Sequence, residues 1–346
     1  MPEKNRRKTV TMDDIARRLG VSKNAVSLAL AGKAGVSEVL RKSVLETARN
    51  LGYLRGEAGA SEVQSCIVAL VPSYIRDDGS FYSDVFWAIE HESRARGLTM
   101  VTFGVNTQAQ REMRLPAVPQ GLSPAGYLAI GRLDTEYLKR ICDSGQRVVC
   151  VDIRSELPIS SVSADNINAG RRAAEYLLDK GFGRIGFAGP AFGVQSVYER
   201  WCGFRQALEK RGIRPDESMC ILGSRQSFEL LDSVPALLPY YHDLAQKPDA
   251  WFCAGDMIAL SMCRLLKEEG LRIPQDVSVM GCDDLKVAEL IHPPLTTIHI
   301  DRKLMGRQAV SMLLDGDSGT VSHMLLECSL VERESVGVRP RPQTHV

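Results

Sequence analysis

The first side chains that could do chemistry lie in the segment KNAVSLAL, residues 23–30. At helical spacing Lys23, Asn24, Ser27 and Leu28 share one side of this segment, while its other side is apolar and suits a protein core. Lysine can donate to O6 and N7 of guanine, asparagine can pair with N6 and N7 of adenine, and leucine can contact a thymine methyl group. The spacing therefore predicts a helix that reads base edges in a major groove.

Three short helices are predicted around this face. Thr11 and Asp14 have the spacing of a capping box at the start of a first helix, and Gly20 can end that helix. Ser22 can cap the second helix and Ser37 a third, whose apolar residues keep helical spacing. Two helices joined by a glycine turn and followed by a third form a helix-turn-helix unit, whose second helix enters the major groove. The alternative is a small helical bundle that contacts other proteins.

The same unit is suited to contact a polyanion. Its hydroxyl groups can donate to phosphates, which sets the register on DNA without reading sequence. These side chains are Thr11, Ser22, Ser27 and Tyr53. Residues 1–56 carry 12 Lys and Arg against 5 Asp and Glu, a net charge of +7, whereas the remaining residues carry 31 against 37, a net charge of −6. A basic head on an acidic body predicts that the head alone binds double-stranded DNA.

From residue 65 onward, short apolar segments alternate with helical ones. The predicted strands are CIVALVP (66–72), LTMVTFG (98–104), GYLAIG (126–131), RVVCVD (147–152), RIGFAGP (184–190), AWFCAG (250–255) and VSVMGCDD (277–284). This alternation predicts parallel sheets in a doubly wound α/β architecture. The segment is too long for one such sheet, so we expect two lobes, with ligands bound beyond the carboxyl ends of the strands.

One motif in this region imitates a dinucleotide site. GFGRIG (181–186) matches G-x-G-x-x-G, but that chemistry needs a strand before the glycines and a helix after them. Here the helical AGRRAAEYLLDK (169–180) precedes the motif and a strand follows it. We therefore interpret Gly181 as a helix C-cap, and Gly183 and Gly186 as turn and packing glycines.

Other enzyme and membrane signatures are absent from the sequence. It contains no G-x-S-x-G, H-E-x-x-H or Walker A pattern, and its nine cysteines include no C-x-x-C pair. We expect reduced structural thiols, no metal and no cofactor. The start MPEKNRRKTV has no signal-peptide character, and the run CIVALV (66–71) is far shorter than the roughly 20 residues of a membrane span. A cytoplasmic, nucleoid-associated protein is expected.

The segment VTMDDIARRLGVSKNAVSLALAGKAGVSEVLRKSVLETARNLGY resembles the headpiece of the lactose/galactose repressor family, with its DIA, GVS, AVS and LGY elements at the family's spacing. The family's base-reading positions fall on Lys23, Asn24 and Leu28. Many relatives carry arginine at the last of these, so Leu28 implies a different operator. The resemblance extends over the body, where its landmarks lie at 162–190, 200–213, 253–284 and 293–298.

The resemblance implies the division of the chain. It gives a headpiece (1–55), a linker (56–63), a body that resembles periplasmic sugar-binding proteins (64–338) and a tail (339–346). Within the body, the first lobe would contain 64–163 and 293–321. The second lobe would contain 164–292 and 322–338.

The resemblance also implies an effector site in the cleft between the lobes. The residues it places there are Phe81, Tyr82, Ser196, Arg200 and Asp283. The neighbouring Asp284 is expected to cap backbone instead.

Two departures from the family bear on the effector. Gly255-Asp256 stands where many sugar-binding relatives show Asn-Asp, and Arg225 lies near the position of an aromatic wall. Arg200 and Arg225 together favour the hypothesis of an anionic effector such as a sugar acid or a sugar phosphate.

The linker departs from the family as well. Relatives join head and body through a hinge helix whose leucines wedge into the minor groove. LRGEAGASEVQ (54–64) contains Gly56 and Gly59, which disfavour a helix, and no leucine after Leu54. We expect no leucine wedge. The competing view is that Val63 replaces the leucine.

These features predict a dimeric, ligand-responsive transcriptional regulator, most often a repressor in this family, which binds a pseudo-palindromic operator. A small molecule in the cleft would move the first lobes and so change DNA affinity. The alternative is a cytoplasmic sugar-binding protein or sugar-active enzyme with a vestigial headpiece.

Overall fold

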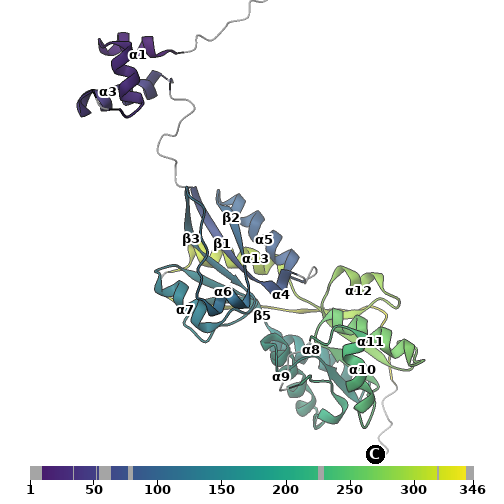
Figure 1. The fold of residues 1–346 in the computed structure, drawn as a ribbon. Coiled ribbons are helices and arrows are strands. Elements are labelled where there is room, and N and C mark those ends of the chain that lie inside the picture. Colours follow the sequence, from purple (N-terminus) through teal and green to yellow (C-terminus); the bar gives the residue numbers. More distant parts are fainter. Residues whose placement is uncertain are drawn as a thin grey trace, which may run out of the picture. The chain divides into compact units, whose positions relative to one another are not determined.

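The computed structural model describes residues 10–33, 35–51, 53, 64–76, 81–224, 230–317 and 319–339. The chain divides into two compact units, Met1–Gln64 and Ser65–Val346. Figure 1 shows the small helical unit and the larger α/β unit, which we call the headpiece and the body. No helix among the described residues is long and apolar enough to cross a membrane.

The headpiece consists of α1 (Met12–Leu19), α2 (Lys23–Leu30) and α3 (Glu38–Leu51). The predicted helix signals are confirmed. The backbone N–H and the hydroxyl of Thr11 both donate to Asp14 Oδ2, at 2.9 and 2.8 Å. Gly20 ends α1 in the left-handed region, with φ of 67°. Ser22 Oγ accepts a hydrogen bond from the backbone N–H of Ala25 at 3.2 Å and so caps α2.

The three helices of the headpiece share one apolar core. Its buried members are Ile15, Ala16, Val26, Ala29, Val44 and Ala48. Arg41 of α3 supplies a contact that the sequence did not indicate. Its Nη2 donates to the carbonyl of Lys33 at 2.7 Å, and its Nη1 to the carbonyl of Ala29 at 3.5 Å. These carbonyls lie at the end of α2 and three residues beyond it, so Arg41 ties α3 to the C-terminal end of α2.

The body contains two sheets. The first has the order β10-β5-β4-β3-β1-β2. Its strands are β1 (Gln64–Pro72), β2 (Thr99–Val105), β3 (Leu122–Ile130), β4 (Val148–Val151), β5 (Ser160–Ala164) and β10 (His323–Leu326). The pairs β1–β2, β3–β4, β4–β5 and β5–β10 are parallel.

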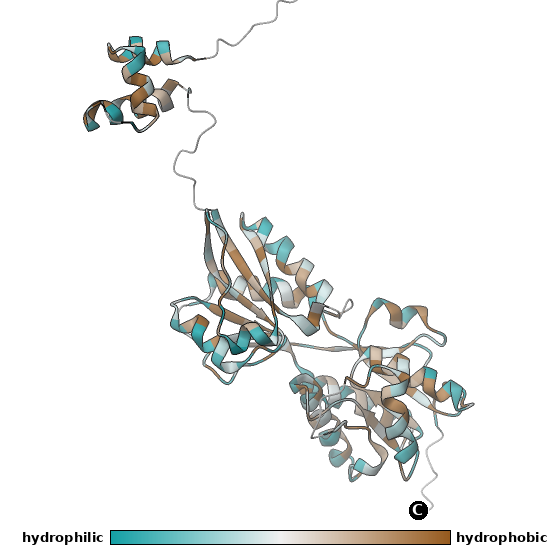
Figure 2. Cartoon of the chain, in the orientation of Figure 1, coloured by the Kyte–Doolittle hydropathy of each residue, from teal (hydrophilic) through white to brown (hydrophobic). Residues whose placement is uncertain are grey.

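Helices cover both faces of the first sheet, as the apolar character of its strands requires. They are α4 (Ser73–Arg76), α5 (Phe81–Ala95), α6 (Thr107–Arg111), α7 (Thr135–Asp143) and α13 (Arg302–Asp315). Alternate residues of β1 enter different cores: Ile67 and Ala69 pack in the cluster that contains residues of α5 and α13, and Val68 in the cluster that contains residues of α7. Figure 2 shows the strands brown, with hydrophilic residues on the outer faces of the helices.

The second sheet has the order β11-β9-β8-β7-β6, in which only the β9–β11 pair is antiparallel. Its strands are β6 (Ile185–Ala188), β7 (Ala250–Cys253), β8 (Ser278–Asp283), β9 (Thr296–His299) and β11 (Ser329–Val331). The accompanying helices are α8 (Asn166–Asp179), α9 (Gln195–Lys210), η1 (Glu217–Met219), α10 (Val234–Asp243), α11 (Asp256–Glu268) and α12 (Lys286–Leu290). The predicted doubly wound architecture with two sheets is confirmed.

The sheet order corrects the expected lobe boundaries. The segment 293–321 was expected in the first lobe, but β9 within it pairs with β8 of the second sheet. The segment 322–338 was expected in the second lobe, but β10 within it pairs with β5 of the first sheet. The physical reason is apolar burial, since Ile298 of β9 is fully buried in its sheet and Leu326 of β10 is buried at the edge of the other. The chain therefore crosses between the sheets after β5, after β9 and after β10.

The glycine motif at 181–186 has the predicted arrangement. The helix α8 precedes it and β6 follows it, which is the reverse of a dinucleotide site. Gly181 follows the helix with φ of 92°, and a Cβ at Gly186 would lie 2.6 Å from the carbonyl oxygen of Met219. A Cβ at Gly183 would meet nothing within 4 Å.

Candidate DNA-binding face and effector site

The second helix of the headpiece presents the predicted polar face. Lys23, Asn24 and Ser27 are exposed along α2, while Val26 and Ala29 on its opposite side are buried. Leu28 is only half-buried. A Cβ added at Gly35 would lie 3.4 Å from Leu28 Cδ1, so this leucine is close to the loop after α2.

Lys23 already has an anionic neighbour. Its Nζ lies 2.8 Å from Asp13 Oδ2 in the first turn of α1, and both side chains are more than half exposed. The hydrogen bond to Asp13 and its negative charge raise the pKa of Lys23. The ion pair holds the ammonium group against α1, although Lys23 is the first residue of α2, the end at which a groove-binding helix contacts bases.

The predicted phosphate donors lie on the same unit. Thr11, Ser22 and Ser27 are exposed, whereas Tyr53 is half-buried and packs against the core of the headpiece. The hydroxyl of Ser22 accepts from Ala25, so its own hydrogen remains to be donated. Their contact with DNA stays a prediction.

In the body, aspartates follow the carboxyl ends of two strands. Asp152 comes directly after β4 of the first sheet, Asp283 ends β8 of the second, and Asp284 follows it. All three have positive φ angles, 68°, 113° and 54°, which are unusual for residues other than glycine. Strained backbone of this kind is typical of ligand sites.

Arg200 of α9 lies beside Asp283 and is 5% exposed. Its Nη1 is 3.2 Å from Asp283 Oδ1 and also donates to the carbonyl of Ala254, while its Nε donates to Asn166 Oδ1 at 3.0 Å. The structure thus brings together the predicted residues Arg200 and Asp283. The arginine is fixed by three acceptors of its own chain.

Asp152 is a candidate site residue that the sequence analysis missed. The hydroxyl of Tyr82 donates to its Oδ2 at 2.8 Å, and its buried Oδ1 has no hydrogen-bond partner. Burial raises the pKa of Asp152 to about 7, against the opposing effects of the Tyr82 hydrogen bond and the Arg200 charge, and the negative charge of Asp283 adds to the rise. The sequence does carry one signal for it: Asp152 is a polar residue directly after a buried parallel strand, and ligands bind beyond the carboxyl ends of such strands.

The other residues predicted to bind the effector lie at the start of α5, in the first turn of α9 and outside the described residues. Phe81 and Tyr82 form the start of α5, with ring centroids 5.1 Å apart in an edge-to-face arrangement. The guanidinium of Arg302 lies 5.7 Å from the centre of the buried Phe81 ring. Ser196 is half-buried in the first turn of α9. Arg225 lies outside the described residues.

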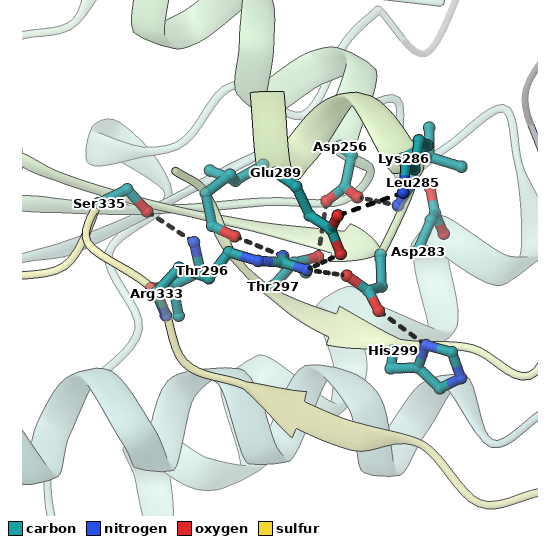
Figure 3. A network of polar contacts seen from close by, with 12 residues as sticks. Asp256, Asp283, Leu285, Lys286, Glu289, Thr296, Thr297, His299, Arg333 and Ser335 are labelled. Atoms are coloured by element: carbon teal, nitrogen blue, oxygen red, sulfur yellow. Dashed lines mark hydrogen bonds and ion pairs between the residues drawn. The ribbon is translucent and has the colours of Figure 1, made fainter. Parts of the chain in front are cut away.

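The expectation that Asp284 caps backbone is wrong. Its Oδ2 is 2.9 Å from His299 Nδ1, and its Oδ1 accepts a hydrogen bond from Arg333 Nη2 at 2.7 Å. The strained backbone of this turn points the carboxylate at β9 and at the segment after β11, where a histidine and an arginine are available. Arg333 also reaches Glu289, as Figure 3 shows.

Asp256 belongs to the interior. Its side chain is fully buried, its Oδ1 accepts from the Thr297 hydroxyl at 2.6 Å, and its Oδ2 accepts from the backbone N–H of Leu285 at 2.7 Å (Figure 3). Burial, followed by the charge of Asp283, raises the pKa of Asp256 to about 8. Gly255 instead adjoins the site, because a Cβ there would lie 3.2 Å from Asp283 Oδ2.

Within the described part of the chain, no group of three or more His, Cys, Asp or Glu side chains could hold a metal ion.

Comparison with known proteins identifies the family of both units. Residues 11–55 match the family described as bacterial regulatory proteins, lacI family, and residues 174–336 match the periplasmic binding protein-like domain. The HTH-type transcriptional regulator CelR of Thermobifida fusca is 31% identical over 346 residues, which cover 95% of this chain and 99% of that protein. The HTH-type transcriptional repressor CytR of Escherichia coli K12 is 30% identical over 349 residues, with 98% and 100% covered.

Solved structures of two such proteins have a similar fold. The CelR–cellobiose complex has a TM-score of 0.66 and 26% identity, and the match covers 94% of this chain and 99% of that one. The lac repressor dimer bound to operator and the anti-inducer ONPF has a TM-score of 0.63 and 23% identity, and the match covers 96% and 100%. The protein is therefore a transcriptional regulator with an N-terminal helix-turn-helix headpiece and a periplasmic-binding-protein-like body, and it belongs to the LacI family.

Proposed function

We propose that this regulator acts in the cytoplasm as a homodimeric repressor. In this proposal Lys23, Asn24 and Leu28 read a pseudo-palindromic operator. The observation that carries it is the exposed Lys23-Asn24 pair at the start of the second helix of a packed helix-turn-helix unit. In such units these positions contact base edges. We assign the protein no catalytic role.

The proposed effector is a neutral compound rich in hydroxyl groups, bound around Asp152, Arg200 and Asp283. Two carboxylates face one guanidinium there, and that guanidinium is already engaged by Asp283. Because Asp283 already pairs with Arg200, an anionic ligand would have to compete with this carboxylate for the guanidinium, whereas hydroxyl groups can donate to the carboxylate oxygens. The structure thus favours a neutral sugar over the sugar acid suggested by the two arginines. The complex of the relative CelR with cellobiose supports the same class.

The operator is tested by incubating the full-length protein with a random duplex library and sequencing the retained DNA. An enriched palindrome is expected. Abutting half-sites around a flexible central step would show that residues 54–63, outside the described ranges, still wedge into the minor groove. Failure to enrich any sequence in the absence and presence of sugars would contradict the proposal.

The effector class is tested by thermal shift with cellobiose as the neutral probe and gluconate as the anionic one. Stabilisation by cellobiose, lost in the Asp283→Asn variant but retained in Lys286→Met, is the expected result, since Lys286 is exposed and pairs with Glu289 of its own helix. Stabilisation by gluconate alone would overturn the neutral assignment.

The rival function is a sugar-binding protein or enzyme with a vestigial head. It is distinguished by replacing Lys23 and Asn24 with alanine in the full chain. The proposal expects lost DNA binding and unchanged ligand binding, whereas the rival expects that the parental protein binds DNA no better than the variant.

A further inference from the structure

One buried arginine contacts both the effector-site turn and a helix of the first lobe. Arg302 begins α13, which packs against α5 and the first sheet, and its side chain is 9% exposed. Its Nη1 donates to the backbone carbonyl of Asp283, and its Nη2 to that of Asp284 at 3.2 Å. The same guanidinium lies against Asp84 of α5, with Nε and Nη2 at 3.2 and 3.1 Å from Asp84 Oδ2.

The turn that Arg302 contacts is strained and is held by three arginines from three segments. Two successive residues other than glycine, Asp283 and Asp284, have φ angles in the left-handed region, where such residues are strained. Arg200 binds the side chain of Asp283, Arg333 the side chain of Asp284, and Arg302 the two carbonyls. A turn held in this way changes conformation when one of the contacts is lost.

The other end of the contact is the first turn of α5. Phe81, under the Arg302 guanidinium, and Tyr82, which donates to Asp152, both lie one turn or less before Asp84. The start of α5 therefore contacts the effector site at Asp152 directly and at Asp283 through Arg302.

We propose that Arg302 is the positioning residue that couples the Asp283 side of the effector site to α5. When the Asp283 carboxylate changes partner, as it does on binding a hydroxyl-rich ligand, the turn relaxes and its carbonyls release Arg302. The guanidinium then shifts against Asp84 and Phe81, and the start of α5 moves with it. The role of the ligand in this inference rests on the proposed function, but the contact network does not.

The coupling is tested without DNA or ligand, by amide hydrogen exchange of the full chain. The four proteins are the parental chain, Asp283→Asn, Arg302→Met and the double variant. Asp283→Asn mimics loss of the carboxylate charge at the effector side, and asparagine tolerates the positive φ. We expect it to speed exchange in α5 by about threefold or more in the parental background, but not in the Arg302→Met background, as coupled residues are non-additive.

Two further variants test whether a change in the turn reaches α5 through Arg302 or whether α5 responds to a general loss of packing. Arg333→Met also frees the turn, and among the described contacts Arg333 reaches Asp284, Glu289 and the carbonyl of Leu295 but nothing on α5. It should therefore speed α5 exchange in the parental background, through Arg302, and leave it unchanged in the Arg302→Met background. Asp84→Asn cuts the link at its other end and should also abolish the response to Asp283→Asn, even if Arg302→Met fails to fold.

The inference is overturned if Asp283→Asn leaves α5 exchange unchanged, or if its effect persists in the Arg302→Met or Asp84→Asn background. Failure of the operator selection or of the sugar titration would count against the proposed function alone, because neither enters this measurement.

Discussion

Lys23 Nζ and Asp13 Oδ2 lie 2.8 Å apart and join the first position of α2 to the first turn of α1. The residue expected to donate to guanine is therefore held by a carboxylate of its own headpiece. Because both groups are more than half exposed, the pair contributes little to stability. Its effect falls on DNA binding, since Asp13 competes with phosphate and guanine for the same ammonium group.

Replacing Asp13 with asparagine should strengthen binding to any duplex. The change removes the competing carboxylate and one negative charge near the DNA. We expect an affinity gain of about two- to fivefold at low salt that shrinks as salt screens the charge. Fluorescence anisotropy with a labelled duplex measures it. In a Lys23→Met background the same replacement should give a smaller gain, and an equal gain in both backgrounds would show that the ion pair has no specific effect.

Asn24 and Ser27 should differ in the kind of loss they cause. Asn24→Ala should relax discrimination at one base pair of the selected operator by about 1–3 kcal/mol, because a bidentate contact to adenine is lost. Ser27→Ala should weaken binding uniformly across sequences, as expected for a phosphate contact. Affinities for every single-base variant of the operator distinguish the two. A uniform loss for Asn24→Ala would remove it from the base-reading set.

Gly170→Ala should destabilise the body. A Cβ at Gly170 of α8 would lie 1.9 Å from the carbonyl oxygen of Arg200 in α9, so the two helices must move apart. Overpacking of this kind costs about 1–3 kcal/mol. Thermal unfolding, followed by fluorescence, should show a lower Tm. Gly183→Ala is the matched control, because its Cβ meets nothing within 4 Å and its Tm should stay within about 1 °C of the parental value.

The effect of Asp152 on stability should depend on pH. The pKa of this carboxyl is about 7 in the folded protein, above the value of about 3.9 for an unfolded chain. Between pH 3.9 and pH 7, roughly, Asp152 is protonated in the folded state but ionised in the unfolded state. The free energy of unfolding therefore falls as pH rises through this range. Asp152→Asn removes this titration. We therefore compare the Tm of the variant minus the Tm of the parental protein at two pH values. This difference should be larger at pH 8 than at pH 5 by about 3–6 °C. A difference that does not change with pH would show that Asp152 is not protonated in the fold.

The sequence predicts those parts of the molecule that follow from local patterns. Seven apolar segments identify seven strands, and capping residues locate the three helices of the headpiece. The strands β5, β9, β10 and β11 escape this approach because they are short, polar or at an edge, and their pairing partners make them strands. Two of them, β9 and β10, lie in the opposite lobe from the one expected, whereas α13 and β11 lie where the expected division placed them.

In the candidate effector site, too, the sequence indicates only what local motifs carry. Arg200 and Asp283 follow from recognisable motifs, and the structure brings them together. The contact between Arg302 and Asp84 joins residues 218 positions apart, and no local pattern indicates it. The partners of Asp284 are equally non-local, since Arg333 lies 49 positions away. Side-chain partners of this kind are set by the fold.

The positions of β10 and β11 have a consequence for synthesis on the ribosome. These two strands are close neighbours in the chain, yet each completes a different sheet, and β10 pairs with a strand more than 150 positions earlier. The first sheet cannot be completed before β10 has emerged, nor the second before β11 has, so the nascent chain holds two unfinished sheets with open edges until then. Such edges invite pairing with other chains. Truncation before β10 leaves both sheets without these strands and should yield aggregated protein.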